Sequence, residues 1–329
     1  IGFLGIVTAA EFHAPEPLLW LSAAIIGGAS GGYGAYVRAR WSYVLKDGPK
    51  LHTAFSLEGA IDEGIFVVGP IIATLLATGI EPASGVVFAA LVGLAGGLWF
   101  LSQRETEPPI VAKTLASDTA AATTSVTSPP AILVPGVPFI AGTFVAMGAV
   151  FGSVDVSTVA FAKAAGHSSM AGLFLAFIAF GSMSAGLAYG AKHWRSRLSS
   201  RFAVGTLMLA AMVTLLLTVH SVIVLPFVMV LTGIAIAPTI INGNAMVQAL
   251  VPLDRLTEGL AWIGTSLNVG ASLGSWLAGM RIDAVGAHGG FFVAMIAGWV
   301  MVLLALIALP VLRKQPGRQP AEPVHDGDA

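Results

Sequence analysis

The hydrophobic positions of this chain fall in long continuous runs rather than in short stretches that alternate with polar residues. These runs cover residues 1–12, 17–37, 53–78, 84–102, 138–162, 168–191, 202–220, 222–251, 258–281 and 289–312. A helix that crosses a bilayer needs about 20 mostly apolar residues, and most of the runs reach that length. Continuous runs predict helices rather than the alternating strands of a membrane barrel. We therefore expect an all-α, polytopic membrane protein.

The run at 53–78 differs from the others because it carries three acids, Glu58, Asp62 and Glu63. On a helix these acids share one polar side, and the opposite side is an aliphatic stripe of Leu57, Ile61, Ile65, Val68 and Ile72. A charge facing lipid costs at least about 2.5 kcal/mol, so intramembrane acids usually face a bundle interior or a water-filled cavity. We expect other helices of the chain to surround this polar side.

The composition agrees with a membrane protein and excludes several classes of function. Of 329 residues, 56% are hydrophobic and 10% are charged, whereas a soluble domain carries about 25% charged residues. The net charge of -1 favours no nucleic-acid partner. Cysteine is absent, which excludes disulfides, thiolate metal sites and cysteine nucleophiles. The chain opens at Ile1 inside an apolar run, so we expect a fragment cut within a membrane span.

The basic residues predict the orientation of the chain in the membrane. Of the 16 Lys and Arg residues, all except Lys163 and Arg281 fall on the side reached after every second apolar run. The positive-inside rule assigns that side to the cytoplasm. We expect a multi-pass protein of the plasma membrane whose C-terminus and longest loop are cytoplasmic.

The longest loop divides the chain into two predicted bundles. Residues 103–137 are rich in Thr, Ser, Ala and Pro, which is typical of a flexible linker. We expect a partial transmembrane bundle at 1–102, a six-helix bundle at 138–312 and a disordered cytoplasmic tail at 313–329.

Pairs of glycines four residues apart recur within the apolar runs. They are Gly27/Gly31, Gly28/Gly32, Gly93/Gly97, Gly148/Gly152, Gly186/Gly190 and Gly270/Gly274. Small residues at this spacing let helices approach one another closely in lipid. A phosphate-binding loop is not predicted, because the chain lacks the G-x-x-x-x-G-K-[ST] motif.

Several polar residues inside the runs are candidates for a transport pathway. Asp62 and Glu63 lie deepest in their run, and desolvation would let such a carboxylate exchange a proton near neutral pH. Asp155 is a lone acid with two balanced readings, a pathway acid or a partner for nearby hydroxyls. The side chains of Asn242 and Asn268 are further pathway candidates, although helix–helix hydrogen bonding is the stronger expectation for both.

Glu58 lies nearer the predicted cytoplasmic end of its run than the other two acids. We expect it to pair with Arg38 or Arg40 as a cytoplasmic gate. Gly69 and Pro70, further along the same run, predict a break in the helix.

Three stretches resemble the major facilitator superfamily, and in particular its actinobacterial-type members. The first is G-x-x-x-R-A-R-W from Gly34 to Trp41, the second is S-L-E-x-x-x-D-E from Ser56 to Glu63, and the third is the Gly69-Pro70 pair. The resemblance implies two six-helix bundles joined by a cytoplasmic linker, with this chain starting in the third of twelve helices. The fifth-helix motif of the family's drug:proton antiporters is matched only in part, because Ile65 and Ala73 stand where that motif has glycines.

The resemblance implies a secondary active transporter that moves a small molecule by alternating access, and we favour proton-coupled efflux. Two alternatives stay open: proton-independent or uptake transport, and a non-transporting receptor or scaffold on the same fold. We expect no enzyme, cofactor or metal, because the seven histidines lie at run ends or in loops without an H-x-x-x-H pair. The expected partners are the substrate, protons and the lipid bilayer, and the expected oligomeric state is a monomer.

Overall fold

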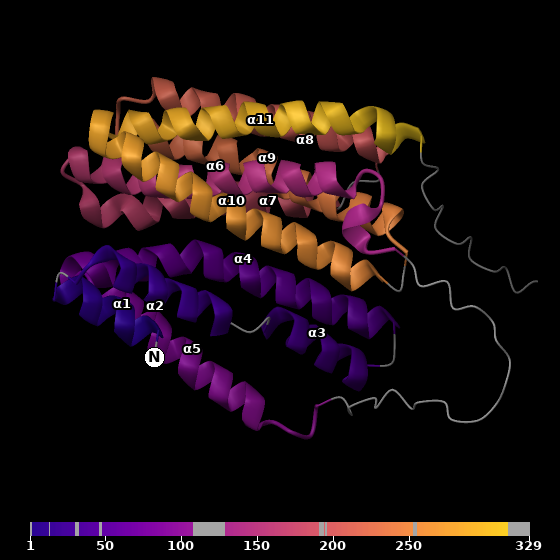
Figure 1. Cartoon of the computed structure of the whole chain (residues 1–329), viewed down its shortest axis with the longest axis horizontal. Coiled ribbons are helices and arrows are strands. Elements are labelled where there is room, and N and C mark those ends of the chain that lie inside the picture. The colour runs from indigo at the N-terminus through magenta and orange to yellow at the C-terminus, as the bar shows by residue number, and fades with distance from the viewer. Residues whose placement is uncertain are drawn as a thin grey trace, which may run out of the picture. The chain divides into compact units, whose positions relative to one another are not determined.

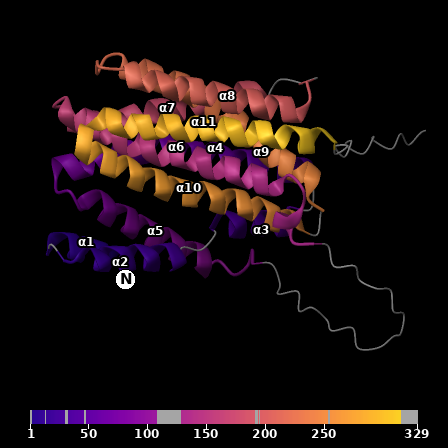
Figure 2. The same cartoon turned by 45° about the horizontal axis from the view of Figure 1, so that its top comes forward.

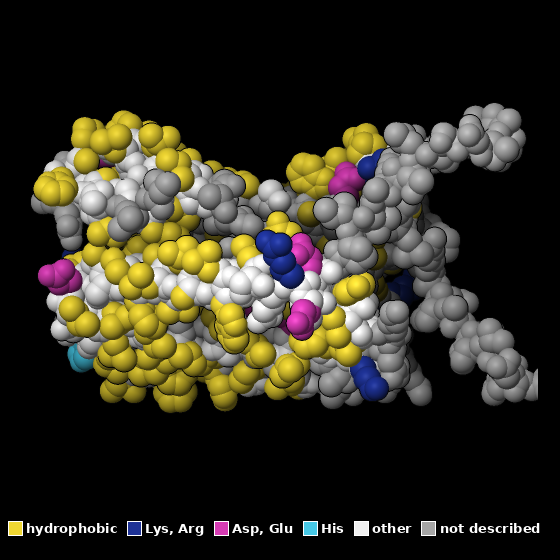
Figure 3. Space-filling model, turned by 90° about the horizontal axis from the view of Figure 1, so that it is seen from below, with side chains coloured by type: hydrophobic (Ala, Val, Ile, Leu, Met, Phe, Trp, Pro, Cys, Tyr) yellow, Lys and Arg dark blue, Asp and Glu magenta, His cyan; other side chains and the backbone are white. Residues whose placement is uncertain are grey.

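The computed structural model describes residues 2–12, 14–29, 33–45, 48–107, 129–190, 194, 196–252 and 255–314. Throughout these ranges the regular secondary structure is helical and contains no strand, as expected for an all-α protein. The chain divides into two compact units, Ile1–Thr124 and Ser125–Ala329. The division falls inside the segment predicted to be a linker. Figure 3 shows hydrophobic side chains over most of the described surface on one face, with few charged ones between them.

The N-terminal unit contains five helices in its described part. They are α1 (Gly2–Glu11), α2 (Glu16–Ala29), α3 (Tyr33–Val44), α4 (Gly48–Gly79) and α5 (Ser84–Ser102). α1 packs against α2, and α4 packs against α5. α2 and the first part of α3 fall within the apolar run predicted at 17–37, and residues 30–32 between them lie outside the described residues.

α4 differs from the helix break expected at Gly69–Pro70. The helix extends from Gly48 to Gly79 with Pro70 inside it, so the break predicted at Gly69–Pro70 does not interrupt the helix. A proline removes only one backbone donor, and helices in membranes tolerate this when local adjustments satisfy the freed carbonyl groups.

The C-terminal unit contains six long helices in its described part. They are α6 (Val137–Ala164), α7 (Ala171–Gly190), α8 (Leu198–Leu215), α9 (Leu225–Leu250), α10 (Leu256–Val285) and α11 (Ala287–Lys314). Figures 1 and 2 show these helices running alongside one another. Among the described residues of the whole chain, six helices are long and apolar enough to cross a membrane: α5, α6, α7, α8, α9 and α11.

α6 is the central helix of the C-terminal unit. It packs against α10 and α11, while α7 packs against α9, and α8 packs against α9 and α11. Large side chains such as Phe144, Met147, Leu209, Phe291 and Met301 are fully buried between these helices. The C-terminal unit therefore has a hydrophobic core of its own.

Two of the predicted glycine pairs face each other and bring α6 and α10 into backbone contact. A Cβ atom added to Gly148 or Gly152 would collide with the carbonyl oxygen of Leu267 or Ala271. A Cβ added to Gly270 or Gly274 would collide in the same way with carbonyl oxygens of α6. We call these four glycines the α6–α10 seam. Close approach of this kind is what small residues permit in a membrane, where helices gain little from hydrophobic burial.

α7 and α9 make a similar contact through single glycines. A Cβ on Gly181 would collide with the carbonyl oxygen of Val230, and one on Gly233 with that of Ile178. By contrast, a Cβ added to Gly93 or Gly190 would meet no atom within 4 Å, so these glycines do not mark close contacts. A Cβ added to Gly186, a member of a predicted pair, would lie 3.1 Å from the Cβ of Ala237 in α9. The glycine spacing thus identified the α6–α10 contact and one point of the α7–α9 contact, whereas Gly181 and Gly233 were not among the predicted pairs.

The end of the predicted linker belongs to the C-terminal unit. A short 3-10 helix at Ala131–Leu133 precedes α6, and Ala131 and Val134 are buried in the core near the start of α10. The backbone N–H of Ala131 donates to Oε1 of Glu258 at 3.0 Å, and Arg255 forms an ion pair with the same carboxylate at 3.2 Å. Packing in the C-terminal unit therefore begins before residue 138.

Candidate functional site

α10 carries a polar stripe on an exposed side within the membrane-crossing part of the unit. Gly264, Thr265, Asn268 and Ser272 are all exposed and recur at helical spacing on this side. The hydroxyl of Ser272 donates to the backbone oxygen of Asn268 at 3.0 Å. We call these four residues the α10 polar stripe.

A different exposed side of α10 is apolar. Its residues are Trp262, Val269, Leu273, Trp276, Leu277 and Met280. α10 has 30 residues, which is long enough to cross a bilayer, yet it is not among the six helices of the described chain that are apolar enough to be recognised as spans. The polar stripe explains this difference. A helix with one apolar and one polar exposed side is typical of a position between lipid and a water-filled space.

Asp155 lies on α6, which packs against α10. Its side chain is exposed, although α6 is the most buried of the candidate spans in the described chain. The neighbouring hydroxyls are committed elsewhere: Ser153 donates to the backbone oxygen of Gly274, and Ser157 and Thr158 donate to carbonyls one turn earlier. These hydroxyls therefore stabilise the helices, and their recorded bonds do not hold the Asp155 carboxylate.

The contacts across the seam place Asp155 and Asn268 on the same side of the helix pair. Successive contacts advance together along both helices, so α6 and α10 are parallel. Successive residues of a helix are rotated by about 100° around its axis. Measured around the axis from the direction of the seam, Asp155 is offset by about 70° in one sense on α6, and Asn268 is offset by about 100° in the other sense on α10. Because the two helices are parallel and face each other across the seam, rotations in opposite senses turn both residues toward the same side of the helix pair.

The same contacts give the spacing of the two residues along the helix axes. Gly148 meets Leu267 and Ala271, so Asn268 lies level with Gly148. Asp155 is seven residues further along α6, which corresponds to about 10 Å. The two polar groups therefore lie on one side of the helix pair but at different heights along it.

Asn242 occupies a different environment. It is buried in α9, and its Oδ1 accepts a hydrogen bond from the Tyr189 hydroxyl at 2.9 Å. Nη1 of Arg201 donates to the same hydroxyl at 3.2 Å. The side chain of Asn242 thus joins α9 to α7, and the structure does not bring it to the side that carries Asp155 and Asn268.

The candidate acids of α4 are described only in part. Asp62 is exposed and Glu58 is half-buried. The side chains of Glu63 and Arg38 lie outside the described residues. The predicted pathway and gate of the N-terminal unit therefore stay predictions.

Arg40 has a clear position at the C-terminal end of α5. Its Nη1 donates to the backbone oxygen of Phe100 at 2.8 Å and to the Thr106 hydroxyl at 3.4 Å, and its guanidinium lies 3.9 Å from the Phe100 ring centroid. A cation at this end of a helix interacts favourably with the unpaired carbonyl groups and the helix dipole. The structure thus shows Arg40 fastening α3 to α5.

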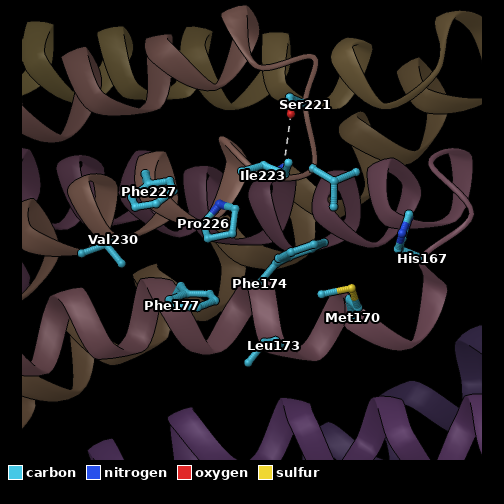
Figure 4. A pocket seen from close by; sticks show the side chains of 11 residues that line it. His167, Met170, Leu173, Phe174, Phe177, Ser221, Ile223, Pro226, Phe227 and Val230 are labelled. Carbon is cyan, nitrogen blue, oxygen red and sulfur yellow. Dashed lines mark hydrogen bonds between the residues drawn. The ribbon is translucent and has the colours of Figure 1, made fainter.

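An apolar cavity of about 830 Å³ lies between the first turns of α7 and α9. Figure 4 shows Phe174, Phe177 and Phe227 around it, with His167 near one end. None of the residues predicted for the pathway lines this cavity. Because it lacks a charged lining residue, it does not form part of the candidate site.

The sequence identified Asp155 and Asn268 but did not single out Thr265 or Ser272. The missed signal was available: Thr265, Asn268 and Ser272 follow one another at intervals of three and four residues in an otherwise apolar helix. Serine and threonine are common in membrane helices as hydrogen-bonding residues, so these two positions drew no attention without their exposure.

The fold defines an all-α polytopic membrane protein, and α10 carries exposed polar residues within it. Residues 191–326 match the family described as Major Facilitator Superfamily. This region contains α8, α9, α10 and α11, and it covers less than half of the chain. The match supports a membrane transporter of the major facilitator kind. No curated protein and no solved structure gives a significant match.

Proposed function

We propose that this protein is a secondary active transporter of the major facilitator kind, which moves a small molecule by alternating access. The observation that carries the proposal is the placement of Asp155 and Asn268 on one side of the α6–α10 pair. Transporters of this architecture bind substrate near mid-membrane between two bundles that rock against each other. A polar side within a membrane-crossing bundle gives a hydrophilic or charged substrate a place to bind away from lipid.

We further propose proton-coupled efflux across the plasma membrane. An intramembrane carboxylate that gains a proton loses its charge, which favours closure of the bundle around it, and loss of the proton favours the wet, open state. Asp155 is the described acid best placed for this step. Asp62 and Glu63 of α4 are the candidates for it in the N-terminal unit.

Cysteine labelling tests the polar path directly, because the natural chain contains no cysteine. Single substitutions Thr265→Cys, Asn268→Cys and Ser272→Cys should react with a water-soluble maleimide in membrane vesicles. The matched controls Val269→Cys and Leu273→Cys lie on the apolar side of the same helix and should react far more slowly. Equal reaction of the two sets would contradict a water-filled path beside α10.

A transport assay tests the coupling. Ethidium, a lipophilic cation that would suit an acidic path, is the probe in proteoliposomes with an imposed pH gradient. Asp155→Asn should retain insertion and lose dependence on the gradient, whereas Asp283→Asn, at the exposed end of α10, should behave as the wild type. A wild-type flux that is the same with and without the pH gradient would favour proton-independent transport. The absence of flux for a range of probes would favour a receptor or scaffold.

A further inference from the structure

A second polar cluster lies where α7 ends and α8 begins. The Tyr189 and Trp194 rings are stacked with centroids 4.5 Å apart, and Nε1 of Trp194 donates to the backbone oxygen of Tyr189 at 3.0 Å. The guanidinium of Arg201 lies 6.0 Å from the Trp194 ring centroid and donates to the Tyr189 hydroxyl. The cluster therefore holds the Arg201 cation in a defined place without using an acid.

The charge of Arg201 has no acidic partner among the described residues. The ion pair recorded in that part of the chain joins Arg255 to Glu258, and Nε of Arg201 is buried without a hydrogen bond there. The sequence explains why: residues 156–253, which contain all of α7, α8 and α9, include no Asp or Glu. These three helices therefore supply no carboxylate that could pair with Arg201.

The local backbone adds to the positive potential. Arg201 lies in the first turn of α8, whose N-cap residue, the exposed Arg197, makes no side-chain capping hydrogen bond. The first N–H groups of a helix lack intrahelical acceptors and, with the helix dipole, favour an anion. Arg197 and Arg201 are four residues apart, about one helical turn, at the start of α8.

The position of the cluster indicates which anion. α8 begins an apolar span, Leu198–Thr218, so Arg201 lies where the helix enters the membrane. Trp194, which is exposed, is of the residue type that marks the headgroup level of a bilayer. A basic pocket at this level meets lipid headgroups, and an arginine fork matches the oxygens of a phosphate group.

We propose that Arg201 and Arg197 bind the phosphate of an anionic phospholipid in the leaflet at the start of α8, which the orientation predicted from the basic residues makes the cytoplasmic leaflet. Tyr189 is a positioning residue: its hydroxyl accepts from Arg201 and donates to Asn242, which fixes the guanidinium against α7 and α9. The lipid would therefore stabilise the contacts among α7, α8 and α9. This proposal does not depend on the transported substrate.

The test uses the full chain in dodecyl maltoside, titrated with phosphatidylglycerol and, separately, with phosphatidylcholine. The midpoint of thermal unfolding and the lipid retained in native mass spectrometry are measured for each titration. Phosphatidylglycerol should raise the midpoint saturably and phosphatidylcholine should not. Arg201→Gln should weaken the apparent affinity for phosphatidylglycerol by about tenfold or more, because a charge-assisted fork is lost.

Three variants separate charge from packing. Arg281→Gln removes an exposed arginine near the C-terminal end of α10, and it should leave the affinity for phosphatidylglycerol unchanged. Tyr189→Phe should lower the starting midpoint yet retain most of the lipid response, because Arg201 keeps its charge. Arg201→Lys keeps a positive charge but lacks the paired N–H donors of the guanidinium, so it should bind phosphatidylglycerol several-fold more weakly than the wild type. This variant replaces Arg201→Gln in the comparison if the Gln variant does not fold.

Two results would overturn the proposal. One is an equal lipid response in Arg201→Gln and Arg281→Gln, which would make the effect nonspecific. The other is full reproduction of the midpoint shift by inorganic phosphate or glycerol phosphate with loss of phosphatidylglycerol retention, which would assign the site to a soluble phosphate.

Discussion

The α6–α10 seam makes the sharpest prediction for stability. Gly270→Ala adds one methyl group to α10 at a point where the structure has no room for it. The new Cβ would overlap the carbonyl oxygen of Val145 and would lie 2.7 Å from its carbonyl carbon and 3.0 Å from the Ala149 nitrogen. All three atoms belong to the backbone of α6, so no side-chain rotation can relieve the overlap. The two helices must move apart.

The magnitude follows from two opposing effects. Overpacking of this kind costs about 1–3 kcal/mol. Replacing glycine by alanine within a helix returns about 0.5–1 kcal/mol. We therefore expect a net loss of about 1–2 kcal/mol in the free energy of unfolding for Gly270→Ala. Gly264→Ala is the matched control, because its Cβ meets no atom within 4 Å, and it should be neutral or slightly stabilising.

Thermal unfolding in detergent, followed by circular dichroism, measures the difference between the two variants. A double variant with Gly148→Ala provides a further check, because Gly148 contacts α10 in the same seam. Once the first methyl group has separated the helices, the second should cost less than it does alone. Equal stability of Gly270→Ala and Gly264→Ala would refute the close backbone approach.

Three other predictions follow from contacts at the ends of the helices. Tyr189→Phe removes the hydroxyl that donates to buried Asn242, and it should cost about 1–2 kcal/mol of unfolding free energy in a thermal assay, with Asn242→Ala adding little more. Glu258→Gln removes the charge from a partly exposed ion pair with Arg255 but keeps an oxygen that can accept from the Ala131 N–H. It should therefore cost no more than about 1 kcal/mol, and a larger loss would contradict the weak contribution expected of this pair. A reporter active only in the cytoplasm should work when fused at residue 120 and fail near residue 83, and the reverse pattern would invert the orientation.

The sequence by itself determined the class of protein and much of its helix content. Long apolar runs admit only helices in a membrane, because every backbone polar group must be paired there. The spans at 84–102, 138–162 and 202–220 were predicted close to α5, α6 and α8 for this reason. The helix break predicted at Gly69–Pro70 was wrong, because a single proline does not by itself end a helix.

Only the tertiary structure decided which small and polar residues work together. The spacing of Gly148/Gly152 and Gly270/Gly274 indicated close contacts, but nothing in the sequence paired α6 with α10. That pairing sets the direction of every side chain on both helices, and so it places Asp155 and Asn268 on one side while Asn242 turns inward to Tyr189. The type of a residue determines its chemistry, but its exposure depends on which neighbouring helix covers it. In this protein the covering helix can lie more than a hundred residues away in the sequence, as Gly148 and Leu267 do.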